Sequence, residues 1–170
     1  MLIQEFLSEP MEGVPAIGPD SDPLRSPWLL QECQVLDVRI DALRSTAAVL
    51  LEQRAAFDYL RGNTGIIVMR GIRSVDWKIA GSPGALTAWA VVGATVAAGS
   101  EGFEVSIGLS PNARLAGTAE TIEYYAMDAN IGLIIPDYLE ASNSEIRSTV
   151  ATWESAAVPI ERSSLRSGQY

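Results

Sequence analysis

The chain has 170 residues, of which 48% are hydrophobic and 19% charged, and 21 acidic against 12 basic side chains give a net charge of −9. It contains no histidine, one cysteine and one lysine, so the commonest general base and metal ligand near neutral pH is missing. This composition argues against most familiar enzymes, against metal sites made of nitrogen and sulfur ligands, and against a disordered chain. We expect one folded domain with a real core, no cofactor and no metal ion.

The start of the chain and its cysteine content bear on the compartment. A single cysteine cannot form an internal disulfide, and the residues after Met1 lack the basic region and apolar run of a secretory signal. The longest nearly uncharged stretch, residues 79–100, is broken by Pro83 and several glycines, so we expect no membrane span. Together these features predict a cytoplasmic protein.

The negative charge gathers at the two ends of the chain. Residues 1–27 carry five acids and one Arg, residues 28–114 carry eight acids and eight bases, and residues 115–170 carry eight acids and three bases. Such an excess repels nucleic acid and anionic lipid, and it can steer a basic partner toward the protein. The alternative is that the charge serves solubility alone.

Residues 1–27 hold five of the nine prolines. Proline fixes φ and removes a backbone donor, so neither a helix nor a central strand can run through the segment, and we expect an acidic arm. Four apolar residues near its start are spaced like one face of a short helix: Leu2, Ile3, Phe6 and Leu7. Such a face could dock on the domain or on a partner. We place a single domain at residues 28–158 and a frayed polar tail at residues 159–170.

The first regular pattern of the domain lies in residues 34–43, where apolar and polar residues alternate as in a half-buried strand. The next segment, residues 45–60, has two interpretations. Its alanines and leucines favour a helix capped by Ser45. A turn at Arg44 and Ser45 would instead make the segment the second strand of a hairpin.

Further strands are expected in the middle of the chain, and residues 64–77 are read either as a strand pair or as one long bent strand. Residues 64–77 are rich in β-branched residues and include Gly71, which permits a bulge. A loop at residues 81–84, with its Gly-Ser-Pro-Gly sequence, separates them from strand-like residues 86–96.

The clearest hairpin follows. Residues 103–109 alternate strictly, Ser110-Pro111-Asn112 turns the chain with proline at the second turn position, and residues 113–126 return. In the return strand, Tyr124 and Tyr125 lie on opposite faces because successive side chains of a strand alternate.

Near the C-terminus, a short apolar run at residues 131–135 is stopped by Pro136. Residues 144–154 then have the pattern of a helix capped by Ser144. The elements as a whole predict an α+β domain with a mostly antiparallel sheet of five or six strands and one or two helices.

Acidic and aromatic residues are densest in the return strand of the hairpin. We predict a partner-binding edge there, made by Glu120, Glu123, Tyr124, Tyr125 and Asp128. Tyrosine offers a large contact area at a low entropic cost, and carboxylates complement Arg and Lys on a partner. Asp137, Glu140 and Glu145 extend this acidic surface. The alternative is an ordinary strand with a solvated face.

An alternative polar site lies on one face of the first strand, where Asp37, Arg39 and Asp41 recur at two-residue spacing, about 7 Å apart. A carboxylate pair tuned by a guanidinium suits acid–base chemistry or a basic ligand. The simpler interpretation is the wet side of a sheet.

The remaining reactive or aromatic residues favour structural roles. Cys33 has no histidine partner or helix start to lower its pKa, so we expect it to be buried and inert. The four tryptophans are expected in the core or at its edge: Trp28, Trp77, Trp89 and Trp153.

In size and acidity the chain resembles the acidic cytoplasmic immunity proteins of bacterial toxin systems, although no specific motif or functional residue carries over. The resemblance and the missing catalytic chemistry predict a non-enzymatic protein that masks a basic protein partner. Two other hypotheses are a small carboxylate-based enzyme using Asp37 and Asp41, and an assembly component whose residues 1–27 wrap a neighbouring subunit. The oligomeric state is left open.

Overall fold

The computed structural model describes residues 1–58, 60–81 and 89–166. Its seven strands are β1 (Gln34–Asp41), β2 (Thr46–Glu52), β3 (Thr64–Ile79), β4 (Trp89–Gly99), β5 (Gly102–Ser110), β6 (Ala113–Ala129) and β7 (Ala157–Arg166). Its helices are α1 (Asn143–Thr149) and the short 3-10 turns η1 (Ile3–Leu7), η2 (Pro19–Ser21) and η3 (Pro27–Leu30). The fold is therefore mainly β, with more strands than the five or six expected.

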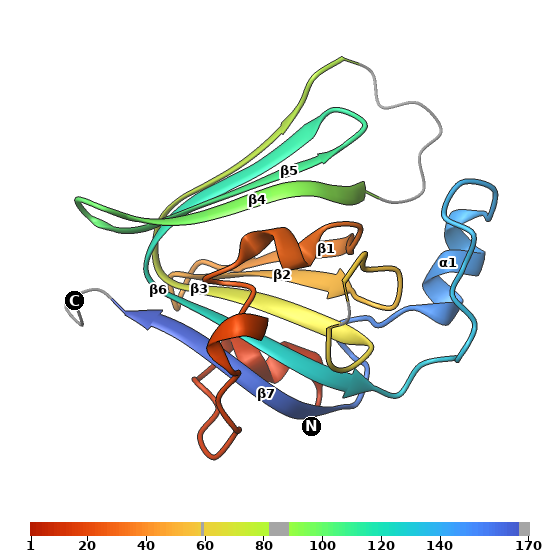
Figure 1. Ribbon diagram of the computed structural model, residues 1–170, viewed down its shortest axis with the longest axis horizontal. Coiled ribbons are helices and arrows are strands. Elements are labelled where there is room, and N and C mark those ends of the chain that lie inside the picture. Colours follow the sequence, from red (N-terminus) through yellow and green to blue (C-terminus); the bar gives the residue numbers. More distant parts are fainter. Residues whose placement is uncertain (59, 82–88, 167–170) are drawn as a thin grey trace.

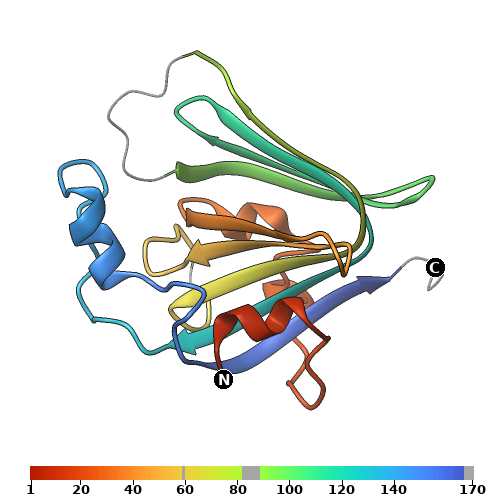
Figure 2. The same cartoon turned by 180° about the vertical axis from the view of Figure 1, so that it is seen from behind.

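All named strand pairs are antiparallel, and the long strands β3 and β6 pair along nearly their whole length. Their first and second halves have different outer neighbours. One layer contains β1, β2, the first half of β3, the second half of β6, and β7. A second layer contains β4, β5, the first half of β6, and the second half of β3. Figures 1 and 2 show how β3 and β6 curve from one layer into the other.

The bend in β3 falls where the sequence predicted a bulge. Gly71 has φ +64, which suits glycine, and the register with β6 shifts between Ile72 and Ser74. A Cβ at position 71 would also lie 2.9 Å from the carboxyl group of Glu120. A side chain there would be strained in its backbone conformation, and the exposed Glu120 side chain would have to move aside.

The strands follow the order β3-β2-β1-β4-β5-β6-β7, and β3 also pairs with β6, so the two layers are joined a second time by the contact between β1 and β4. Among the described residues, β1 and β4 share two residue pairs, Gln34 with Ala90 and Val35 with Trp89, and the described part of β4 begins at Trp89. From Asp37 to Asp41, β1 is therefore paired on one side only within the described part of the chain.

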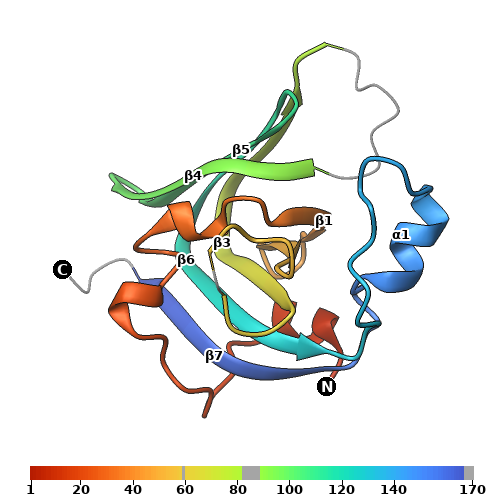
Figure 3. The same ribbon diagram turned by 45° about the vertical axis from the view of Figure 1, so that its right-hand side comes forward.

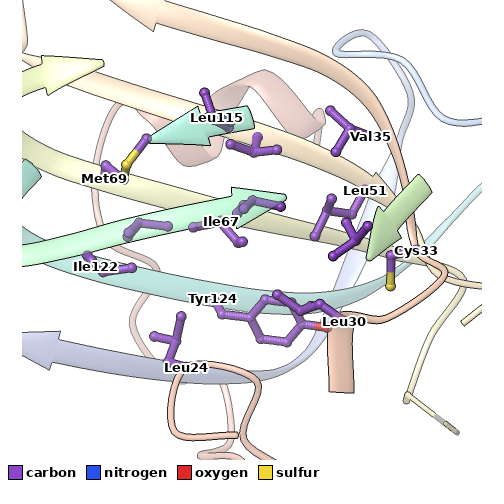
Figure 4. Close-up of a cluster of buried hydrophobic side chains, with 14 of the residues drawn as sticks. Leu24, Leu30, Cys33, Val35, Leu51, Ile67, Met69, Leu115, Ile122 and Tyr124 are labelled. Carbon is purple, nitrogen blue, oxygen red and sulfur yellow. The ribbon is translucent and has the colours of Figure 1, made fainter. Parts of the chain in front are cut away.

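The space between the layers is filled by the larger of two hydrophobic clusters, which we call the inner cluster. Figure 4 draws 14 residues of this cluster and labels Leu24, Leu30, Cys33, Val35, Leu51, Ile67, Met69, Leu115, Ile122 and Tyr124. The second cluster, which we call the outer cluster, covers the outer side of the first layer, where η1 and residues 151–157 pack on β2, β3 and β6. Because both faces of β2 are buried, its sequence lacks alternation, and segment 45–60 begins as the second strand of a hairpin rather than as a helix.

The N-terminal arm takes the first of its two expected places, on its own domain, whereas the C-terminal segment differs from the expected tail. The arm folds back on its own domain: Ile3, Phe6 and Leu7 are buried, and η1 lies across the first layer (Figure 2). The expected frayed tail is corrected for residues 159–166, which belong to β7 and pair with β6. Residues 167–170 lie outside the described residues.

Two further boundaries also move. α1 starts at Asn143 because Ser142, not Ser144, is the N-cap and forms a capping box with Glu145. It ends at Thr149, since Val150 is extended. Most of the predicted loop at 81–84 and the start of the predicted strand at 86–96 lie outside the described residues. None of the described helices is long and apolar enough to cross a membrane.

Cys33 lies in the inner cluster with its side chain fully buried. Burial, reinforced by the Glu52 carboxylate, raises the pKa of its thiol to about 12. We expect alkylation by iodoacetamide at pH 8 to be at least ~1,000-fold slower in the folded protein than in urea, because thiolate is the reactive form. Rapid labelling of the folded chain would contradict this burial.

The same pKa makes stability fall at alkaline pH. The folded state holds the Cys33 proton more tightly than the unfolded state, in which the thiol ionises near pH 8.5–9. The contribution is therefore fully present below pH ~8.5 and is lost as pH rises toward 12, by at most about 1.4 kcal/mol per pH unit. Denaturant unfolding of the wild type and Cys33→Ala between pH 8 and 11 checks this, and we expect a shallower slope for the variant.

Candidate functional site

The predicted partner-binding edge is not an exposed edge. Glu123, Tyr124 and Tyr125 have relative exposures of 0–1%, and only Glu120 and Asp128 are exposed. The physical reason is that this half of β6 lies between β3 and β7, with the inner cluster on one face and the outer cluster on the other. The alternation of the strand is correct, but both faces are covered, so the three side chains are not accessible to a partner.

Glu123 and Tyr125 instead fasten the N-terminal arm. The Arg70 Nε donates to Glu123 Oε2 at 2.8 Å, and its two Nη groups donate to the carbonyl oxygens of Phe6 and Leu7. The Tyr125 hydroxyl donates to the same Glu123 oxygen at 3.2 Å and accepts from the Met11 amide. These contacts join the arm to the first layer.

The alternative polar site is divided by the structure. Asp37 accepts a hydrogen bond from the Trp153 indole at 2.8 Å, and the Arg39 guanidinium lies 4.8 Å from the centre of the same ring. Asp41 does not join them: it accepts from the Leu43 and Arg44 amides and pairs with the Arg44 side chain, an arrangement that lowers its pKa. Asp41 thus shapes the β1–β2 turn.

Asp37 and Arg39 do line a small cavity of 210 Å³ between β1 and α1, together with Arg147, Trp153 and Glu154. Arg39 lies 3.6 Å from Glu154, which is largely exposed. The Asp37 carboxylate also accepts from the Val38 amide, so both of its oxygens are engaged. The lining is mixed polar and apolar, and the charged groups of Asp37 and Arg39 are already engaged with Trp153 and Glu154.

A different surface stands out between β6 and α1, in the loop of residues 131–141. Four large apolar side chains are exposed there: Leu133 at 97%, Ile134 at 77%, Ile135 at 45% and Leu139 at 87%. Monomeric proteins expose single apolar side chains routinely, but a contiguous run of this kind marks an interaction site. Figure 3 shows the loop leaving the end of β6 and rising to α1.

The backbone of this loop is held in place by Arg54, which forms a buried ion pair with Glu52. The Arg54 guanidinium contacts both carboxylate oxygens of Glu52, which is fully buried, at 2.6 and 2.8 Å. Its remaining N–H groups donate to the carbonyl oxygens of Gly132, Ile134 and Thr149. The exposed apolar run therefore has a fixed backbone on either side of Leu133.

Three exposed carboxylates accompany the apolar run: Asp137, Glu140 and Glu145. Asp137 accepts from the Leu139 and Glu140 amides and so shapes the turn. Hydrogen bonds from Ser142 lower the pKa of Glu145, which keeps it ionised. Among the described residues, none of the three pairs with a cation. We call these carboxylates and Leu133, Ile134, Ile135 and Leu139 the acidic apolar surface.

The apolar run and the three acids are both visible in the sequence, but no pattern there joins them into one surface. Gly132 and Pro136 flank residues 133–135, and no alternation extends this apolar run, which was the available signal that it is not a core strand.

The four tryptophans differ in how far they are buried. Trp153 is 3% exposed, Trp89 is half-buried, and Trp77 and Trp28 are 37% and 57% exposed. No group of three or more potential metal ligands occurs among the described residues.

Comparisons with protein families, with curated proteins and with solved structures found no match to this chain. Its function is therefore argued from its own surface chemistry.

Proposed function

We propose that this protein is a non-enzymatic binding protein that masks a basic protein partner, and that it contacts this partner through the acidic apolar surface. The observation that carries the proposal is the near-complete exposure of Leu133 and Leu139 beside three carboxylates that form no ion pair with any described residue. An apolar centre with a charged rim is the usual composition of a protein–protein interface.

The energetics support this surface. Each large aliphatic side chain contributes about 1.5–3 kcal/mol when it is fully buried, so four of them can supply much of a stable association. The backbone fixed by Arg54 lowers the entropy lost on binding, because the loop is already ordered. The rim carboxylates and the net charge of −9 favour a basic partner and speed its approach.

The two alternative functions have less support. A carboxylate enzyme using Asp37 and Asp41 needs one carboxyl with a raised pKa, whereas Arg44 lowers that of Asp41. An assembly role for residues 1–27 needs a free arm, whereas the apolar side chains Ile3 and Phe6 are buried on the arm's own domain. A masking role uses a surface that the fold leaves open.

The test is affinity capture from lysate of the host with four forms of the protein: wild type, Leu133→Ser, Glu140→Lys and, as a matched control, Glu12→Lys. Glu12 and Glu140 are both exposed, and the two lysine variants change the net charge equally. We expect the wild type and Glu12→Lys to capture the same basic protein, and the other two variants to retain at most a tenth of it. Capture by Glu140→Lys should also depend less on salt.

Equal capture by all four forms would contradict the proposed surface. Equal loss in Glu12→Lys and Glu140→Lys would mean that only net charge matters. Recovery of no specific protein by the wild type at low salt would contradict the masking function itself.

A further inference from the structure

The outer face of the second layer is open, unlike that of the first. η1 and residues 151–157 cover the outer face of the first layer, whereas no described helix or strand lies over the second (Figures 1 and 2). The open face consists of the alternate residues of β3, β4, β5 and β6 that point away from the inner cluster. It holds a shallow groove, and all residues that line this groove belong to these four strands.

The strand register places the side chains of this face in rows. Partners on β4, β5, β6 and β3 form two neighbouring rows: Thr95, Ser106, Ala116 and Asp76, then Ala97, Glu104, Thr118 and Ser74. Neither row contains an aromatic or a large aliphatic side chain. Because most of the side chains are short, a second sheet can approach to the usual separation of about 10 Å.

The charges that line the groove are Asp76, Glu104 and Arg114. Asp76 is neutralised by Lys78 at 2.7 Å. Arg114 donates to the Ser106 hydroxyl but meets no carboxylate, and Glu104 meets no cation, among the described residues. Since Glu104 pairs with a residue four positions after Arg114 on β6, the two unpaired charges lie about 13 Å apart along the strands.

One unpaired cation and one unpaired anion on the same face complement a second copy of that face. A two-fold axis in the interface, perpendicular to the line from Arg114 to Glu104, puts each guanidinium over the carboxylate of the other copy. Both copies use the same patch, so the two charges form two ion pairs. A basic partner would instead meet Arg114 as a like charge, and an acidic partner would meet Glu104. We propose that the protein dimerises through this face, with Arg114 of each copy paired with Glu104 of the other.

The dimer is expected to be weak. Four strands about 4.8 Å apart, with about six residues of each, give a face of roughly 400 Å². Each partner in a standard stable interface buries about 800 Å². The net charge of −9 adds repulsion between the copies. We expect a dissociation constant on the order of 0.1 mM. The face shares no residue with the acidic apolar surface, so dimerisation is independent of the masking function.

The test is sedimentation equilibrium of the wild type, Arg114→Glu and Glu104→Arg at roughly 0.01–1 mM, which spans this constant. Each variant alone places like charges opposite one another and should dimerise at least tenfold more weakly than the wild type. An equimolar mixture of the two should recover the dimer. In the mixed dimer the introduced glutamate faces the introduced arginine, and the native Glu104 faces the native Arg114.

Two controls make the same changes in net charge away from this face. Arg147→Glu and Glu12→Arg alter exposed residues that do not line the groove, and both should dimerise like the wild type. Misfolding cannot explain the expected result, because two misfolded variants would not recover a dimer on mixing. The proposal is overturned if the wild type remains monomeric over this range, if either face variant dimerises as tightly as its control, or if mixing restores no dimer.

Discussion

Arg54→Ala is expected to destabilise the protein by about 3–5 kcal/mol, because it leaves the fully buried Glu52 carboxylate without its counter-charge. The substitution also removes the donors for the carbonyl oxygens of Gly132, Ile134 and Thr149. The loop of residues 131–141 should therefore lose protection before the rest of the chain unfolds. Urea unfolding measures the first effect, and native-state hydrogen exchange measures the second.

Arg73→Ala is the matched control, because Arg73 pairs with Glu120 at 3.5 Å and both side chains are about half exposed. It should change stability by less than about 1 kcal/mol. The double variant Glu52→Gln, Arg54→Met removes both charges and should recover part of the loss in stability, but it should leave the loop unprotected. If Arg54→Ala costs no more than Arg73→Ala, the buried pair does not hold the loop.

Much of the sheet could be predicted where one face of a strand is solvated. Residues 103–109 alternate because β5 has an inner face in the core and an outer face in solvent, and the turn at residues 110–112 is as expected. The bulge beside Gly71 could also be predicted, since glycine adopts without strain the positive φ that other residues avoid. Hydrophobic periodicity and turn residues depend only on neighbouring positions in the sequence, so they predict these elements without knowledge of the rest of the fold.

The rest depended on contacts between distant segments. The covering of the first layer by η1 and residues 151–157 buries the second face of β2 and of the second half of β6. Because both faces of β2 are covered, both carry apolar residues, and such a sequence is hard to distinguish from that of a helix. The same covering buries Tyr125, which was expected to contact a partner. No period in residues 120–128 could reveal that an arm more than 100 residues away lies against them.

The two candidate sites were hidden for a similar reason. Each acid and apolar residue of the acidic apolar surface was visible, but their exposure follows from Arg54, which lies 78 residues before Gly132. The apolar cavity of 440 Å³ beside β1 needs Val38, Trp77 and Trp89 to meet across three strands. Composition predicts only the sign of the charge on a proposed partner, whereas the position of an exposed surface or cavity depends on the topology of the sheet.

Arg70→Ala should be the second severe substitution, with an expected loss of about 3–5 kcal/mol. Glu123 is 1% exposed and its Oε1 has no hydrogen-bond partner among the described residues, so the Arg70 bond to Oε2 is its one contact with a cation. The same guanidinium holds the Phe6 and Leu7 carbonyls, and the Phe6 ring packs 4.9 Å from Tyr125. The variant should therefore release the N-terminal arm as well as lose stability.

Limited proteolysis separates these two effects, because a released arm is cut before the sheet unfolds. Phe6→Ala removes the packing but leaves the Arg70–Glu123 pair, and it should cost about 3–5 kcal/mol without leaving a buried charge unpaired. Arg70→Met combined with Glu123→Leu removes both charges, so it should recover part of the stability lost in Arg70→Ala while the arm stays sensitive. If the double variant is no more stable than Arg70→Ala, then the cost arises from the lost carbonyl contacts rather than from the unpaired Glu123 carboxylate.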